Sequence, residues 1–252
     1  SFWIAGFSFG AWIALQLVMR RPEIEDYVLI SPPAKKRDFN FNYPSDGEKV
    51  DYKVTLYPTQ KKWLYMLDMP AREVEESMID RDFITTVEKK IEEPMHYSAS
   101  SYLNHSYVDT LDKTTLKASS YFDPESNPKT QIIAKQIRQK YTSNIERAKE
   151  INTFFKAQSL TYTLKPDLLD INNSTDSFLF EKRRGYCVHF ASSFVTMARM
   201  SGIPARIVTG YKAERSESLN NYLVVKEKNA HAWAELYING TWVRYETTAT
   251  AS

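Results

Sequence analysis

The chain has 252 residues, of which 42% are hydrophobic and 25% are charged, and its formal net charge is +2. This length can bury one or two hydrophobic cores, and the near balance of acids and bases without a basic stripe excludes nucleic acid as an expected partner. A single cysteine excludes disulfides within the chain, and no apolar run of about 18 residues predicts a transmembrane helix. Because the chain begins at Ser1 without Met and stops abruptly at Ser252, we expect a piece of a longer protein.

Residues 1–38 have the pattern of a strand, a sharp turn, a helix and a second strand, which predicts a short β-α-β fragment. Residues 6–10 (GFSFG) match the G-x-S-x-G nucleophile elbow, and the whole stretch resembles an α/β-hydrolase fragment. The later strands that would supply an acid and a histidine are missing, and a serine without a base is a weak nucleophile. An esterase acting through Ser8 is therefore a minor alternative.

Residues 39–125 contain short apolar or alternating runs, which turn residues such as Pro58 and Pro94 separate. Runs of this length and period are typical of strands. We predict a small antiparallel β-rich region here.

Residues 126–252 begin with two expected helices. Asn127 is a suitable N-cap, and Pro128 suits the first helical position. The second helix has an apolar face, which predicts one buried side. The residues of that face are Ile145, Ala148, Ile151, Phe154 and Phe155.

Cys187 stands at the start of a third expected helix, which Gly202 ends as a C-cap. Apolar residues recur in this helix at a spacing of three to four: Phe190, Phe194 and Met197. A thiol at a helix N-terminus feels the positive end of the macrodipole, which favours the thiolate, and its own N–H is an unsatisfied donor suited to an oxyanion. Gly185 would let the backbone approach a substrate closely. The alternative is a buried, inert cysteine.

The region after residue 230 predicts a β-hairpin. Residues 231–238 and 241–247 alternate in polarity, and the Asn-Gly pair at residues 239–240 is the strongest short signal for a two-residue turn. Such a turn pairs Ile238 with Thr241.

Counting back along that ladder places Trp233 opposite Glu246, so His231 and Glu246 share one face of the hairpin. Their backbones are then diagonal neighbours, roughly 7–8 Å apart, which a glutamate side chain can span. Glu235 lies on the same face but about 13 Å along the strand, which makes it a weaker partner for the imidazole.

Three other histidines compete with His231 as a base. His189 follows Cys187 by two residues, and residues two apart on a helix do not face each other. We therefore expect His189 to have a packing role or a local hydrogen bond, and we expect His96 and His105 to be structural.

These residues suit nucleophilic catalysis by a thiol. His231 would take the proton of Cys187 and later protonate the leaving amine. Glu246 would fix the imidazole tautomer and stabilise the imidazolium.

The segments FLFEKRRGYCVHFASSFVTMARMSGIPARIVTGY, YLVVKEKNAHAWAEL and WVRYETTA resemble the transglutaminase-like core of bacterial TgpA-type proteins. The upstream segments YKVTLYPTQKKWLYMLDMP and SNPKTQIIAKQIRQKY resemble the β and helical regions that precede that core. The resemblance extends from about residue 42 to the C-terminus.

The resemblance implies an α+β fold with a papain-like transglutaminase core, in which the helix bearing the cysteine packs on an antiparallel sheet. It places the Cys-His-acid triad on Cys187, His231 and Glu246, and implies neither a metal nor an organic cofactor. It also implies a periplasmic domain that membrane helices flank in the full-length protein. Two positions depart from the family, which usually has Asp at Glu246 and Glu at Val188.

The expected activity is acyl transfer from Gln or peptide amides of a protein substrate through a thioester. An amine acceptor makes the protein a transglutaminase, and water makes it an amidase or cysteine peptidase. A non-catalytic domain that binds peptide or cell-wall material is the remaining alternative.

Overall fold

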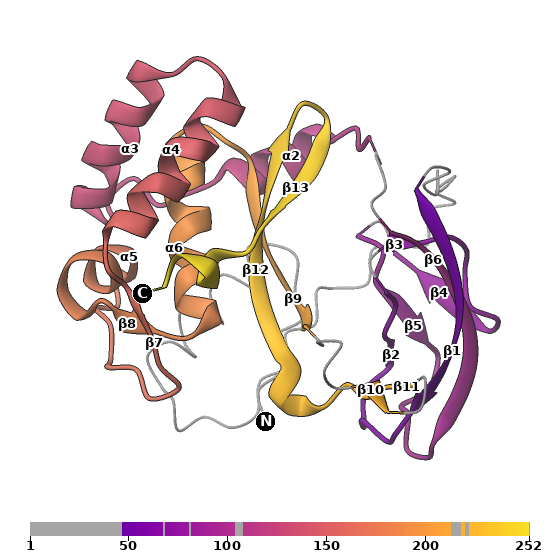
Figure 1. Cartoon of the computed structure of the whole chain (residues 1–252). Helices are drawn as coiled ribbons and strands as arrows, with labels where there is room; N and C mark the ends of the chain where they lie inside the picture. The colour runs from indigo at the N-terminus through magenta and orange to yellow at the C-terminus, as the bar shows by residue number, and fades with distance from the viewer. Residues whose placement is uncertain are drawn as a thin grey trace. The chain divides into compact units, whose positions relative to one another are not determined.

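The computed structural model describes residues 47–67, 69–80, 82–103, 108–212, 218–219 and 222–251. The described residues divide into two compact units, one that ends at Val108 and one that begins at Asp109 (Figure 1). The β-α-β fragment expected over residues 1–38, including Ser8, lies outside the described residues.

The first unit is a pair of small antiparallel sheets, as the turn-separated runs predict. The strands have the orders β1-β6-β3 and β2-β5-β4. Side chains of the strands and of the connections between them form a small core of Leu64, Val74, Ile91, Tyr97 and Ala99. The strands are β1 (Glu48–Leu56), β2 (Trp63–Leu64), β3 (Met69–Pro70), β4 (Ser77–Ile79), β5 (Thr85–Val87) and β6 (Met95–Leu103).

The second unit contains the helices and the other strands. Its three-stranded antiparallel sheet has the order β13-β12-β9, and β7 pairs with β8 in parallel. The helices are α2 (Lys113–Ser120), α3 (Pro128–Lys140), α4 (Asn144–Ala157), α5 (Ser174–Asp176), the π-helical turn η1 (Ser177–Lys182), α6 (Cys187–Met200), η3 (Glu227–Asn229) and η4 (Thr247–Thr250). The strands are β7 (Thr161–Tyr162), β8 (Arg184–Gly185), β9 (Ala205–Tyr211), β10 (Ser218–Leu219), β11 (Tyr222–Leu223), β12 (Ala230–Ile238) and β13 (Thr241–Tyr245).

The compact β unit ends at Val108, whereas the β-rich region expected from the sequence extends to residue 125. The difference is helix α2, which lies between these two positions. Helix α2 packs against α6 and β9, and it therefore belongs to the second unit.

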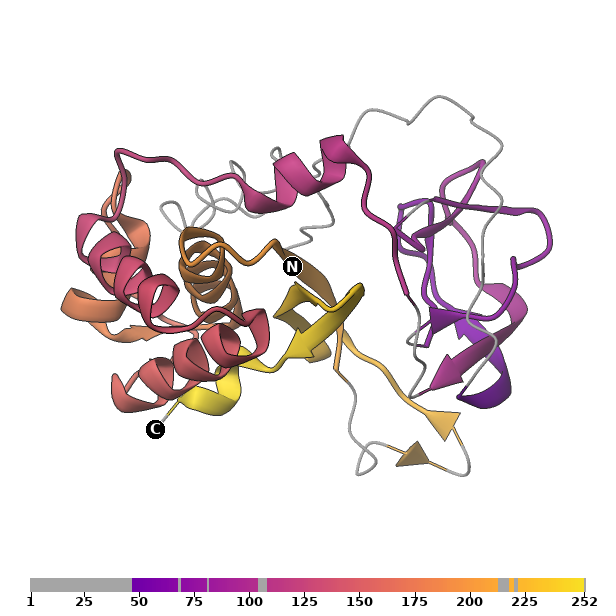
Figure 2. The same ribbon diagram turned by 90° about the horizontal axis from the view of Figure 1, so that it is seen from above.

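Helix α6 is the centre of the second unit. It lies between helices α3 and α4 on one side and the sheet on the other (Figure 2). Twelve of its fourteen residues are buried, which is the pattern of a helix that packs on all sides. The sequence expectation of a cysteine-bearing helix packed on an antiparallel sheet is therefore confirmed.

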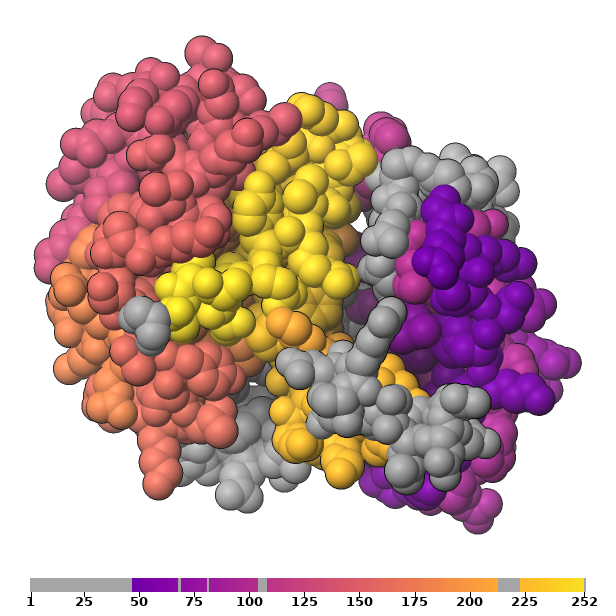
Figure 3. Space-filling view, viewed as in Figure 1, coloured from indigo at the N-terminus to yellow at the C-terminus, as the bar shows by residue number. Residues whose placement is uncertain are grey.

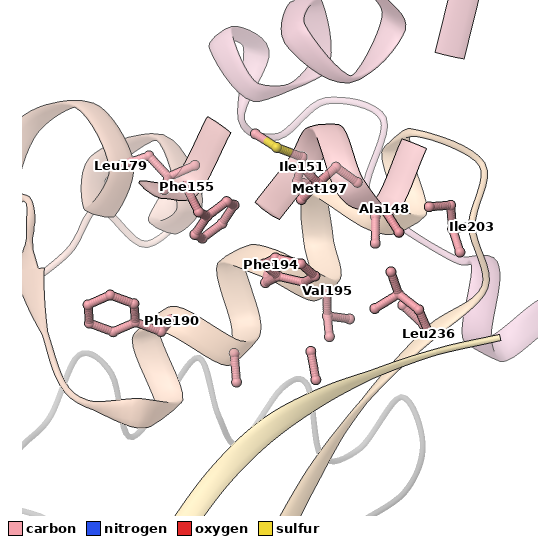
Figure 4. Packing of buried hydrophobic residues seen from close by; sticks show 14 of the residues in the cluster. Ala148, Ile151, Phe155, Leu179, Phe190, Phe194, Val195, Met197, Ile203 and Leu236 are labelled. Atoms are coloured by element: carbon pink, nitrogen blue, oxygen red, sulfur yellow. The ribbon is translucent and has the colours of Figure 1, made fainter. Parts of the chain in front are cut away.

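Aromatic and aliphatic side chains of α4, η1 and β12 pack against those of α6 (Figure 4). Phe155 of α4 packs against Phe194 of α6 with ring centroids 5.0 Å apart, and both are fully buried. Leu236 of β12 closes the core from the sheet side. The surface view shows the C-terminal hairpin and η4 packed beside α4, which extends this packing to the surface (Figure 3).

Helices α3 and α5 cap each other. Asn127 precedes α3 as expected, but its side-chain oxygen accepts the N–H groups of Thr175 and Asp176, at 2.9 and 3.0 Å, and so caps α5. The Asp176 carboxylate in turn accepts the N–H groups of Lys129 and Thr130, both at 2.8 Å. The first turn of α3 thus obtains its cap from a residue 46 to 47 positions away.

The C-terminus of α6 is a Schellman turn. Gly202 has a φ of +83°, which a glycine adopts without strain. The N–H of Ile203 donates to the carbonyl of Ala198 at 2.9 Å, and the N–H of Gly202 donates to Arg199 at 3.0 Å. The predicted C-cap is confirmed. Among the described residues, the helices are too short or too polar to span a bilayer.

Candidate active site

Cys187 is the first residue of α6, and its side chain is buried at 8% exposure. Its sulfur receives hydrogen bonds from its own N–H, from the N–H of Val188, from the N–H of Ala232 on β12 and from the hydroxyl of Tyr162. The first two donors are free because N–H groups in the first turn of a helix have no partner within the helix. The thiol is thus surrounded mainly by backbone donors.

Burial nevertheless raises the pKa of the Cys187 thiol above its ordinary value. The four donors favour the thiolate, but the loss of solvent outweighs them. The start of the helix thus favours the thiolate, as the sequence predicts, but the cost of burying the charge is larger than this effect.

Gly185 allows the side chain of His189 to approach the backbone closely. A Cβ atom at this position would lie 2.8 Å from the Cβ and Cγ atoms of His189 and 3.0 Å from the ring of Phe178. The missing side chain therefore accommodates His189 against the start of α6.

His189 has the local role that its spacing predicts. Its side chain is fully buried, and its Nδ1 atom accepts the N–H of Tyr186 at 3.3 Å. Desolvation lowers the pKa of His189 to about 4, so the ring is neutral at physiological pH. His189 thus holds the helix start in place.

The hairpin that carries the other site residues is confirmed. Asn239 and Gly240 both have positive φ values, of 52° and 84°, as a two-residue turn of type I′ requires. The ladder pairs Ile238 with Thr241 and continues in the expected register to the end of β13. Glu246 follows directly as the first residue beyond that strand.

This register brings Glu246 to His231. Their Oε2 and Nε2 atoms are 3.1 Å apart, and the same carboxylate oxygen is 3.2 Å from the Nζ atom of Lys212. Burial raises the pKa of Glu246, but Lys212 and His231 together lower it by more, so the carboxylate is ionised at neutral pH. Lys212 was not expected, because only the pairing of β9 with β12 brings it near Glu246.

Glu235 has other partners. Its carboxylate binds Arg206 with a shortest distance of 2.8 Å and accepts the indole N–H of Trp233 at 3.3 Å. Glu246 therefore has the contact with His231 that the strand register assigns to it.

The imidazole of His231 is supported by a neighbouring indole. The rings of His231 and Trp233 are stacked with centroids 6.3 Å apart. Gly210 lies opposite His231 on β9, and a Cβ atom there would lie 3.0 Å from the Trp233 ring. Gly210 thus leaves the space in which Trp233 lies beside the imidazole.

Strand β12 joins the two halves of the site. The N–H of Ala232 on this strand donates to the sulfur of Cys187, and the preceding residue, His231, contacts Glu246.

The other histidines contribute nothing to this site in the part of the chain that the structure describes. His96 is remote in sequence and hydrogen-bonds Thr55 at 3.1 Å, whereas His105 lies outside the described residues. Within the described ranges, no group of three or more His, Cys, Asp and Glu side chains could hold a metal ion.

Comparisons with known families match both parts of the chain. Residues 131–247 match the transglutaminase-like superfamily, and residues 26–107 match the TgpA N-terminal domain.

Two curated proteins are similar over part of their length. The chain is 28% identical over 191 residues to the protein-glutamine gamma-glutamyltransferase of Pseudomonas aeruginosa, covering 76% of this chain and 28% of that protein. It is 31% identical over 133 residues to the uncharacterized protein YebA of Bacillus subtilis, covering 50% of this chain and 18% of that protein. The chain thus spans less than a third of either relative.

Solved structures of the periplasmic domain of TgpA from Pseudomonas aeruginosa have the same fold. One matches with a TM-score of 0.75 and 27% identity, over 82% of this chain and 72% of that chain. The ethylmercury-bound form matches with a TM-score of 0.74 and 26% identity, over 83% and 76%.

Proposed function

Since the chain is a TgpA-type transglutaminase-like protein, we propose that it is a cysteine acyltransferase whose triad is Cys187, His231 and Glu246. The substrate is the side-chain amide of glutamine in a protein or peptide. One observation carries the proposal: β12 donates the Ala232 N–H to the sulfur of Cys187, while the preceding residue, His231, holds Glu246 at 3.1 Å.

The two ring nitrogens of His231 then have separate tasks. Nε2 is occupied by Glu246, so Nδ1 is the nitrogen that takes the proton from the thiol. Burial raises the pKa of Cys187, so the thiol depends on this base to become a nucleophile. The imidazolium forms beside an ionised carboxylate, which stabilises its positive charge.

The reaction then follows two half-steps. The Cys187 sulfur bonds to the amide carbon, and the electron pair of the carbonyl moves to its oxygen, to which the Cys187 N–H donates. The electron pair returns, the C–N bond breaks, and His231 gives its proton to the leaving ammonia. A second nucleophile attacks the resulting thioester, gives its proton to His231 and releases the thiol.

The acceptor is proposed from the relatives. The name of the Pseudomonas aeruginosa relative describes transfer of a glutamyl group, so we propose a primary amine, such as that of a lysine, as the acceptor. The similarity to periplasmic domains supports a periplasmic location, with proteins of that compartment as substrates. Hydrolysis by water uses the same thioester and is the second outcome to measure.

The test is an assay of the purified chain with a glutamine-containing protein and a fluorescent primary amine. We expect ammonia release, amine incorporation and an acyl adduct on Cys187 by mass spectrometry. Cys187→Ala should abolish all three signals, and His231→Ala should slow ammonia release at least about 10³-fold.

His96→Ala is the matched control, because it removes an imidazole of the other unit, and it should retain activity within twofold. Ammonia release with glutamate as the product, and no amine incorporation, would identify an amidase instead. A folded chain that forms no adduct and releases no ammonia would defeat the catalytic proposal and leave the peptide-binding alternative.

A further inference from the structure

The backbone of Tyr162 is fixed beside the start of α6. Strand β7 pairs with β8 so that Tyr162 lies opposite Gly185, two residues before Cys187. The N–H of Thr163 donates to the Gly185 carbonyl at 2.8 Å, and the N–H of Thr161 donates to Arg183 at 2.8 Å. Hydrogen bonds on both sides thus hold Tyr162 next to the nucleophile.

The ring of Tyr162 lies over the first turn of α6. It is stacked on Phe190, one turn after Cys187, with ring centroids 6.4 Å apart and an interplanar angle of 27°. Its hydroxyl group hydrogen-bonds both the sulfur and the backbone N–H of Cys187. The side chain keeps 45% of its surface exposed, so a substrate at the thiol also meets the phenol.

The hydroxyl group of Tyr162 is a proton donor at neutral pH. Desolvation, together with the nearby thiol, raises the pKa of Tyr162 above its ordinary value. A group in this state can donate a hydrogen bond to a developing negative charge without losing its proton.

We propose that Tyr162 is a catalytic residue, the second donor of the oxyanion hole alongside the Cys187 N–H. This inference rests on the proposed function. Before substrate binds, the hydroxyl oxygen accepts from the Cys187 N–H, and the hydroxyl proton is donated to the sulfur. The carbonyl oxygen of the substrate enters between them and accepts from both, in the place where negative charge develops.

The step balances without a proton transfer from Tyr162. When the sulfur bonds to the carbonyl carbon, the π electron pair moves onto the oxygen, and the two donors stabilise it there. When that pair returns, the C–N bond breaks and the leaving nitrogen takes the proton held by His231. Tyr162 donates a hydrogen bond throughout and ends unchanged.

Tyr186 provides a matched control. It precedes Cys187 directly, and burial raises its pKa to about 12. Tyr186 is not among the groups that hydrogen-bond the Cys187 sulfur. Tyr186→Phe therefore removes a nearby phenol without removing an oxyanion donor.

The experiment compares two reactions of the same sulfur. Alkylation by iodoacetamide forms no oxyanion, whereas acyl transfer from a glutamine-containing protein does. Tyr162→Phe should lower kcat for acyl transfer about 10²-fold, with KM changed less than threefold and alkylation changed less than threefold. Tyr186→Phe should change both reactions less than threefold.

Comparing alkylation with acyl transfer also distinguishes failure of the Tyr162 assignment from failure of the proposed function. Equal losses of alkylation and acyl transfer in Tyr162→Phe would show that the phenol acts on the thiol, and unchanged or faster acyl transfer would show that it is no oxyanion donor. A wild-type chain that is alkylated at Cys187 but transfers no acyl group would defeat the proposed function itself. The stacking on Phe190 remains in Tyr162→Phe, so its alkylation rate also reports whether the site is intact.

Discussion

The site has two halves that differ in the groups around the reactive side chain. The thiol half is the start of α6 with Cys187, and the imidazole half is the sheet with His231 and Glu246. Around Cys187 most donors are backbone N–H groups, on α6 and β12. Around His231 the partners are side chains, with Glu246 at 3.1 Å and the ring of Trp233 stacked alongside. The thiol half therefore depends on how helix and sheet pack, whereas single substitutions can tune the imidazole half.

The two halves also shift acidity in opposite directions. Burial raises the pKa of the Cys187 thiol, while Lys212 and His231 outweigh burial at Glu246 and lower its pKa. In the proposed mechanism the proton therefore starts on a buried sulfur and moves to an imidazole beside an ionised carboxylate. Four predictions test this contrast.

Removing the carboxylate should have the largest effect. Glu246→Ala takes away the partner of His231 Nε2, and we expect kcat/KM for acyl transfer to fall about 10²- to 10⁴-fold. Steady-state assays measure this. The control is Glu235→Ala, because Glu235 lies on the same face of β12 as His231 but pairs with Arg206. Its kcat/KM should change less than about threefold, and an equal loss of kcat/KM in both variants would contradict the role of Glu246.

Low pH should lower the free energy of unfolding through His189, which packs at the start of α6. Its pKa is about 4 in the folded chain against an ordinary value of 6.5, so between these values the unfolded chain binds a proton that the folded chain does not. The contribution is complete above pH 6.5, and the free energy of unfolding should fall by about 1.4 kcal/mol per pH unit down to pH 4. Urea titrations measure it, and His189→Gln should lose this slope.

A methyl group at Gly185 should disturb the thiol half by crowding. In Gly185→Ala the new Cβ would lie 2.8 Å from the side chain of His189 and 3.0 Å from that of Phe178. Neither side chain can move freely, because both are fully buried. We expect a loss of stability of about 1–3 kcal/mol in chemical denaturation. Gly210→Ala is the counterpart in the imidazole half, where the new Cβ would crowd Trp233. This variant should lose kcat/KM with little loss in the free energy of unfolding, and the opposite pattern would contradict the contrast between the two halves.

Lys212→Gln should have the smallest effect. Its amino group is half-exposed, so its pairing with Glu246 is screened by solvent. Without it the pKa of Glu246 should rise toward its ordinary value, which moves the acid limb of the kcat/KM profile to higher pH. At pH 8 the activity should change less than threefold, and a profile that does not move would show that Lys212 has no influence on Glu246.

The parts of the site that local sequence determines could be predicted. The Asn239-Gly240 turn sets the register, and the register alone brings Glu246 to His231. Tyr162 and Lys212 could not be found in this way, because each reaches the site through strand pairing between distant segments.

The burial of Cys187 also could not be read from the sequence. The helix start was evident, but the raised pKa depends on how closely β12 and Tyr162 cover the sulfur. Similarly, the sequence predicts the position of Asn127 before α3, while its hydrogen-bond partners on α5 depend on the tertiary fold.

The exchange of caps between α3 and α5 has a consequence for the order of folding. Asp176 can complete the first turn of α3 only after the chain between them has closed into a loop, and that loop contains α4 and Tyr162. Neither helix end is satisfied until both are, so the whole loop should gain protection from hydrogen exchange as one cooperative unit. The phenol that we assign to the oxyanion hole would then reach its place in the same event that completes the two helices.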